Sequence, residues 1–130
     1  MTQEQLVDLL VLVKRIGNLF VEVEDLTNQL AESVDRQDEV SIHLVTAMRA
    51  EPIRKLEEAD HALRERLEEL EDEVGMRIRS ILNGDGTAAQ GETEKILAVQ
   101  AAQNIRNYNR LMEKDRIVNR KITRDKSIYQ

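Results

Sequence analysis

The stretch LVDLLVLVKRIGNLFVEVEDLTNQL, residues 6–30, decides the fold of this chain. Its apolar residues return about every 3.5 positions over more than three heptads, which is typical of a long helix packed against other helices. The repeating positions are Leu9, Leu12, Ile16, Leu19, Val23, Leu26 and Leu30. We therefore expect a first long helix over residues 2–34, begun by a capping box between Thr2 and Gln5.

Two later stretches carry a similar repeat. The second consists of Leu56, Leu63, Leu67, Leu70, Val74, Ile78 and Ile81. The third consists of Leu97, Ala101, Ile105, Tyr108, Leu111, Val118 and Ile122. They predict helices over residues 52–82 and over residues 92–123, separated by the helix-ending sequence Asn-Gly-Asp-Gly at residues 83–86. Residues 125–130 are expected to be a frayed tail.

The residues before Pro52 leave two alternatives. Val40, Leu44 and Met48 are in helical register from Asp38 onward. Proline suits the first turn of a helix, and the residue before it avoids the helical conformation. Either a short helix over residues 38–50 ends before Pro52 and a new helix begins, or one helix is kinked at Pro52. We favour the break. The sequence thus predicts a single all-α domain over residues 1–130. It is an elongated antiparallel bundle of three long helices, with the segment 38–50 as an extra short helix.

Composition limits the classes of protein. The 130 residues are 41% hydrophobic and 34% charged and include no cysteine, which suits a folded cytoplasmic protein and excludes disulfides and cysteine nucleophiles. The apolar segment 6–13 is far shorter than the roughly 20 residues of a membrane span, and Glu4 precedes it where a signal peptide would be basic. We expect it to be buried on most sides, with contact to a second chain as the alternative.

Charge is segregated along the chain. The net charge is −6, but residues 104–130 hold eight Lys or Arg against three Asp or Glu, a net charge of +5, so the first 103 residues hold −11. Internal compensation is expected if the last two helices pair antiparallel, which brings the acidic segment 57–73 beside the basic helix. The alternative is an acidic segment of another protein. Nucleic acid is disfavoured as a partner because the whole chain is acidic.

No pattern for chemistry is complete. Glu58 and His61 match the Glu-x-x-His half of a carboxylate-bridged metal site, but a second copy is missing and His61 should face solvent. His43 has no nucleophile beside it. The sequence therefore predicts no catalytic, cofactor-binding or metal-ligating residue, and a binding protein rather than an enzyme.

The last helix is rich in asparagine, which is a poor helix former. Its asparagines are Asn104, Asn107, Asn109 and Asn119. They either line a solvated edge or leave the helix loosely held, so that a helix of a client protein can dock on it or replace it.

With these residues in view, the chain resembles the flagellar type III export chaperones of the FlgN type. The resemblance rests on the leucine-rich first helix (6–30), the charged middle helix (52–82) and the run QNIRNYNRLM at residues 103–112, where family members carry asparagines followed by apolar residues. It covers most of the chain in layout. The basic segment 116–126 has no counterpart in the family pattern.

The resemblance implies a cytoplasmic chaperone without enzymatic activity or cofactor. Such a protein holds hook-associated proteins, which form the hook–filament junction, before export by binding a helical terminal segment. The family's client site lies in its C-terminal part. In this chain that implies Asn104, Tyr108, Leu111, Met112, Asp115 and Val118. The alternative is a structural or assembly coiled coil that homodimerises through residues 6–13.

Overall fold

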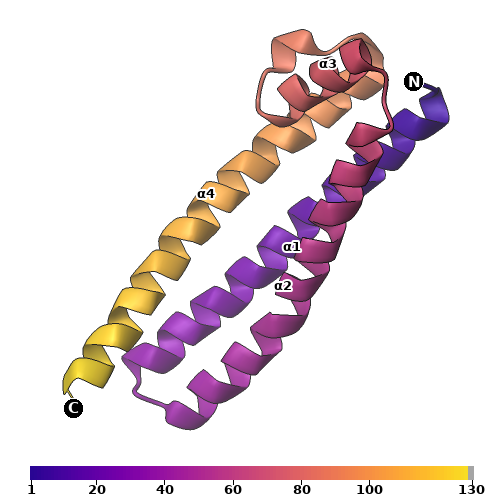
Figure 1. Ribbon diagram of the computed structural model, residues 1–130. Helices are drawn as coiled ribbons and strands as arrows, with labels where there is room; N and C mark the ends of the chain where they lie inside the picture. The colour runs from indigo at the N-terminus through magenta and orange to yellow at the C-terminus, as the bar shows by residue number, and fades with distance from the viewer. Residues whose placement is uncertain (129–130) are drawn as a thin grey trace.

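The computed structural model describes residues 1–128, which contain four α-helices and no strand. Three of them, α1 (Gln3–Asp35), α2 (Glu39–Glu68) and α4 (Gly91–Ile128), are long and lie side by side, as Figure 1 shows. The short helix α3 (Asp72–Leu82) lies at one end of this elongated bundle. The predicted all-α bundle of three long helices is confirmed.

The first helix begins as the sequence predicts. The Thr2 hydroxyl accepts a hydrogen bond from the backbone N–H of Gln5 (3.0 Å), and the Gln5 side chain accepts one from the N–H of Thr2 (2.9 Å). α1 ends at Asp35, and Gln37 turns the chain with a φ of 56°. Asp38 then caps α2. These local signals set the first helix boundaries correctly.

The predicted helix break at Pro52 is wrong, because α2 continues through this residue. The expected short helix over residues 38–50 is the first part of α2, which is 30 residues long. A proline inside a helix costs about 3 kcal/mol. Pro52 is buried, as are Val45 and Ala59 at seven residues on either side, so the packing of α2 against α1 offsets this cost.

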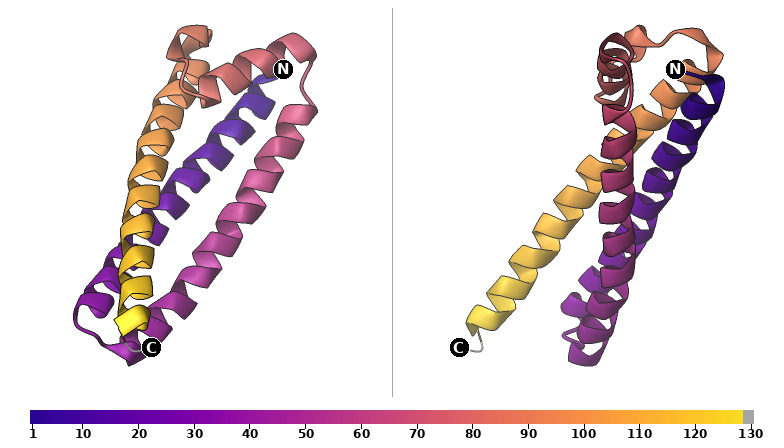
Figure 2. Two further views of the ribbon diagram at one scale, coloured as in Figure 1. Left: turned by 60° about the vertical axis from the view of Figure 1, so that its left-hand side comes forward. Right: turned by 45° about the vertical axis from the view of Figure 1, so that its right-hand side comes forward.

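The break falls instead between Glu68 and Asp72, inside the segment that the sequence assigns to one helix. An ion pair between Arg66 and Asp8 shows that α2 ends level with the first turns of α1. A straight continuation would carry the next apolar residues past the start of α1 into solvent. α3 instead crosses the end of the bundle, as both views of Figure 2 show, and this buries Ile78 completely.

The last helix is longer than predicted. α4 begins at Gly91, where φ is 79°, and continues to Ile128 rather than ending near Thr123. Between α3 and α4 lie Gly84, in the left-handed conformation that the helix-ending sequence predicts, and the 3₁₀ turn η1 (Gly86–Ala88). Residues 129–130 lie outside the described residues, and fraying of the tail stays a prediction.

The core consists of three apolar clusters, and α1 contributes to each of them. The cluster at the α3 end holds Leu6, Leu9, Val13, Leu67, Ile78, Ile81 and Leu97. The middle cluster holds Ile16, Leu19 and Ala59. The cluster at the far end holds Leu26, Leu30, Val34, Val45 and Val118. α1 is therefore the central helix, and α2 and α4 both pack against it.

α4 runs in the same direction as α1. Arg110 Nε donates to Glu24 Oε1 (2.8 Å), and further along both helices Lys121 Nζ donates to Asp35 Oδ1 (2.8 Å). The predicted pairing of the basic helix with residues 57–73 is wrong, since no ion pair among the described side chains joins them. The physical reason is that α3 crosses the bundle end and places α4 on the flank of α1.

Burial of α3 leads to a stability prediction. Ile81 is 0% exposed, and Ile81→Ala should lower the free energy of unfolding by about 2–4 kcal/mol, because the cavity it leaves lies in the cluster that α1 and α3 share. Met76 of the same helix is 69% exposed, so Met76→Ala should change stability by less than about 0.5 kcal/mol. Urea unfolding followed by circular dichroism measures both. Equal losses in the two variants would contradict the packing of α3.

Candidate binding groove

A groove with a volume of about 220 Å³ opens between α2 and α4, with α1 beneath it. α1 contributes its floor through Val13, Ile16 and Phe20, and α2 contributes Asp60 and Leu63 to one wall. The opposite wall consists of Ala101, Asn104, Ile105 and Tyr108 of α4, and Leu82 of α3 also lines the groove. The left view of Figure 2 shows α2 and α4 apart on either side of α1. The lining is mainly apolar.

Two aromatic side chains meet in this groove. The rings of Phe20 and Tyr108 lie edge to face with centroids 5.8 Å apart. Tyr108 is 47% exposed, and Met112 is 42% exposed one helical turn further along α4. Aromatic and methionine side chains present a large apolar surface that adapts to a partner. The exposed part of the α4 wall therefore suits contact with another apolar surface.

An ion pair joins α2 and α4 further along the bundle. Arg49 Nη2 donates to Asp115 Oδ1 at 2.8 Å, and both side chains are partly buried. Asn119 also donates to the Asp115 carboxylate (3.3 Å). Because Arg49 precedes Asp60 along α2 and Asp115 follows Tyr108 along α4, this pair lies beyond the groove on the side away from α3. The groove is thus bounded by α3 at one end and by this ion pair towards the other.

α4 is attached to α1 beside the groove through polar groups. Asn104 Nδ2 donates to the carbonyl oxygen of Val13 (2.8 Å), and Gln100 Nε2 donates to Asn104 Oδ1 (2.8 Å). Gly17 makes room for them, because a Cβ at this position would lie 2.8 Å from Gln100 Nε2 and closer still to Oδ1 of Asn104. The missing side chain of Gly17 is therefore what allows the close approach of the two helices.

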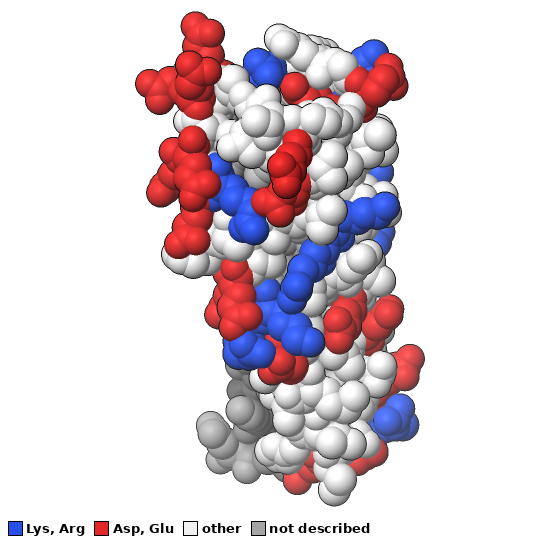
Figure 3. Space-filling view, turned by 90° about the vertical axis from the view of Figure 1, so that its right-hand side faces the viewer, with Lys and Arg blue, Asp and Glu red and all other residues white. Residues whose placement is uncertain are grey.

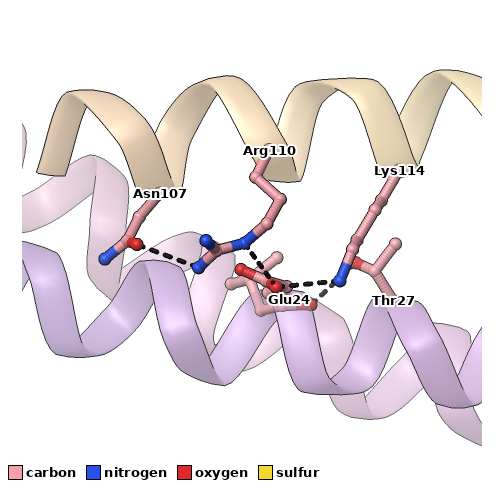
Figure 4. Close-up of polar contacts among 6 residues, drawn as sticks. Glu24, Thr27, Asn107, Arg110 and Lys114 are labelled. Atoms are coloured by element: carbon pink, nitrogen blue, oxygen red, sulfur yellow. Dashed lines mark hydrogen bonds and ion pairs between the residues drawn. The ribbon is translucent and has the colours of Figure 1, made fainter. Parts of the chain in front are cut away.

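About two turns beyond Gly17 on α1, the buried carboxylate of Glu24 makes a further polar contact with α4. Figure 4 shows this contact. Glu24 Oε1 accepts hydrogen bonds from Arg110 Nε and Lys114 Nζ, both at 2.8 Å, while Arg110 Nη2 donates to Asn107 Oδ1 (3.0 Å). Burial by itself would raise the pKa of Glu24, but the hydrogen bonds from Arg110 and Lys114 outweigh it and hold that pKa below its ordinary value. Glu24 is therefore ionised at neutral pH.

The distribution of apolar contacts explains why these polar groups matter. The middle core cluster contains residues of α1 and α2 but none of α4. α4 enters the clusters near its two ends, through Leu97 and Val118, although Leu111 between them is also buried. Through its middle, α4 therefore depends on hydrogen bonds and ion pairs to α1 in addition to single apolar contacts such as that of Tyr108 with Phe20.

The six residues implied by the resemblance have different environments. Asn104 and Tyr108 line the groove, Met112 is exposed beyond it and Asp115 pairs with Arg49. Leu111 and Val118 are buried. Their contact with a client stays a prediction.

Sequence reasoning missed Phe20, Leu63 and Ile105 as parts of one surface. Phe20 is the single phenylalanine of the chain, and that rarity was the available signal.

The four asparagines of α4 have two kinds of environment, buried contact and solvated edge. Asn104 and Asn107 are buried, and they are hydrogen-bonded to Val13 of α1 and to Arg110, the partner of Glu24, respectively, while Asn109 and Asn119 are exposed. The first two thus mark the polar contact with α1, and the last two lie on a solvated edge.

The apolar segment at residues 6–13 is largely covered. Leu6, Leu9 and Val13 belong to the core cluster that α3 completes, and Val7 and Val11 are exposed. α3 therefore covers much of the apolar surface that suggested contact with a second chain. Homodimerisation through this segment stays a prediction.

The histidines lie on the surface. His61 is exposed as expected, and its Nε2 is 3.0 Å from Glu65 Oε1. His43 is exposed as well. Within the part of the chain that the structure describes, no group of three or more His, Asp or Glu side chains could hold a metal ion.

A second hollow of about 310 Å³ lies between the start of α1 and the end of α2. Its lining includes Asp8, Glu65, Arg66 and Glu69, and Arg66 pairs with Asp8 across it. This mainly polar lining offers little surface for hydrophobic docking, so the groove between α2 and α4 is the better candidate for binding an apolar partner.

Comparisons with models of protein families, with curated proteins and with solved structures find no match to this chain. Among the described residues, no helix combines the length and the apolar character that crossing a membrane requires.

The buried carboxylate predicts a pH-dependent stability. Glu24→Gln should cost about 1–2 kcal/mol of unfolding free energy at pH 7, because it removes a charge that Arg110 and Lys114 both contact. Since the pKa of Glu24 is lowered in the folded state, its stabilisation is present above the ordinary value of 4.5 and is lost as the pH falls through the folded value.

The difference between wild type and Glu24→Gln should therefore shrink below pH 4.5 in urea unfolding. Glu22 is exposed on the same helix, so Glu22→Gln is the control. A difference that stays constant with pH would contradict the ion-paired state of Glu24.

The close approach at Gly17 predicts a second loss. Gly17→Ala should destabilise the protein by about 1–2 kcal/mol, although alanine favours a helix, because its Cβ clashes with Asn104. The neighbouring and exposed Asn18→Ala is the control. Thermal unfolding of the double variant Gly17→Ala/Asn104→Ala should show a smaller loss than the sum of the single losses. Additive losses would exclude the clash as the cause.

Proposed function

We propose that this protein is a chaperone that binds an amphipathic helix of a client protein in the groove between α2 and α4. One observation carries the proposal: α2 and α4 leave between them an apolar groove, with the α1 core as its floor. A client helix lying there would complete a four-helix arrangement, with apolar residues at helical spacing in contact with Leu63, Ile105 and Tyr108.

We propose further that the clients are the hook-associated proteins of the bacterial flagellum, held in the cytoplasm before type III export. This narrower proposal rests on the resemblance of the helix layout and of residues 103–112 to chaperones of the FlgN type. Asn104 and Tyr108 of that run line the groove, which is compatible with a client site on the last helix.

A pair of matched double variants tests the groove. Tyr108→Glu/Met112→Glu places two charges on the exposed wall of α4 and should weaken client binding at least about tenfold, because carboxylates would be buried in an apolar contact. Ile96 and Val99 are 55% and 68% exposed, and Val99 lies nine residues from Tyr108 and so on the opposite face of α4. Ile96→Glu/Val99→Glu should change the affinity less than about twofold.

Isothermal titration calorimetry with purified hook–filament junction proteins gives the affinities. Absence of binding of every such protein at about 100 µM would refute the flagellar assignment. Binding that both double variants weaken equally would refute the groove as the site.

A further inference from the structure

We infer that the groove selects a basic amphipathic helix, with lysine or arginine beside its apolar stripe; this inference rests on the proposed function. The observation is an acidic rim along only one side of the groove. We define the α2 rim as Glu57, Asp60, Arg64 and Glu68.

The α2 rim follows from helical spacing. Asp60 lines the groove, Glu57 lies three residues before it, and Arg64 and Glu68 lie four and eight residues after it. Residues at these separations share one face of a helix. Asp60 is a lining residue of the groove, and because Glu57, Arg64 and Glu68 are exposed on the same helix face, helical spacing places them along the same edge of α2. Figure 3 shows acidic side chains gathered along one edge of the molecule from its upper end to its middle.

Two of these acids are available to a partner. Arg64 Nη2 contacts Asp60 Oδ2 at 3.1 Å and so compensates that carboxylate. Among the described side chains, Glu57 and Glu68 take part in no ion pair. The α2 rim therefore carries two uncompensated negative charges, about three turns apart.

On the opposite wall, the lining residues are uncharged. α4 lines the groove with Ala101, Asn104, Ile105 and Tyr108. A helix lying in the groove would place its apolar stripe on the floor and one of its flanks against the α2 rim. Glutamate on that flank would meet Glu57 and Glu68, whereas lysine or arginine would pair with them. The partner that fits is thus a helix with apolar residues at positions i, i+3, i+4 and i+7 and with cationic residues beside them.

Two designed peptides test the inference. Both are 18-residue amphipathic helices with blocked termini and the same leucine stripe, and they carry either lysine or glutamate on the two flanks of the stripe. Fluorescence anisotropy should show the lysine peptide binding about fivefold tighter or more at low salt, because exposed ion pairs each contribute modestly. In about 0.5 M NaCl this preference should fall below about twofold, since salt screens exposed charges.

Matched charge reversals separate the α2 rim from the net charge. Glu57→Lys/Glu68→Lys should abolish or reverse the preference for the lysine peptide. Glu22 and Glu32 are also exposed and form no ion pair among the described side chains. They belong to α1 instead of α2, and neither residue lines the groove. Glu22→Lys/Glu32→Lys changes the net charge equally and should keep most of the preference. Circular dichroism confirms that both variants fold.

The outcomes distinguish this inference from the function it rests on. If both peptides bind the wild type equally, or if the two charge reversals have the same effect, selection by the α2 rim is wrong while docking in the groove stands. If neither peptide binds, or if Tyr108→Ser/Met112→Ser, which removes apolar surface from the α4 wall without adding charge, leaves peptide binding unchanged, docking in the groove is wrong as well. A third peptide, with the lysines kept and the leucines replaced by serine, should bind at least about tenfold more weakly, and equal affinity would also overturn the inference.

Discussion

The apolar stripe of α1 is the contact on which the remaining structure depends. Its residues take part in all three core clusters, together with α2, α3 and α4 at one end, with α2 in the middle and with α2 and α4 at the far end. Along the middle of α1, the apolar cluster is shared with α2 and contains no residue of α4. α2 packs on the middle of the stripe, and α4 contacts the flank of α1 there through hydrogen bonds and ion pairs as well as through the ring contact of Tyr108 with Phe20.

That division creates the groove. Asn104, Glu24 and Arg110 attach the middle of α4 to the flank of α1, and the apolar residues beside this contact do not pack against α2. Ile105 and Tyr108 then face a space that α2 does not fill. Buried polar contacts of this kind can fix the register of a helix pair, because a shift would leave their polar groups without partners. Here they position an apolar surface without covering it.

The functional proposals draw on different observations. Docking of a helix follows from the shape and lining of the groove, whereas the flagellar client follows from the resemblance in layout and in residues 103–112. The residues that the resemblance assigned to a client site include both groove residues and core residues. Tyr108 lies in the groove, but Val118 is a core residue, because apolar spacing alone does not distinguish the buried side of a helix from a binding side.

The sequence by itself determined the helices of this protein wherever the signal is local: the capping box at Thr2, the left-handed Gly84 and the long stripe of α1 depend on neighbouring residues only. Only the tertiary structure decided that Pro52 stays inside a helix, that the chain breaks before Asp72 and that α4 pairs with α1. These outcomes depend on where α1 ends and which of its faces is already covered. Such long-range competition for one apolar stripe leaves no mark on the spacing of residues along the chain.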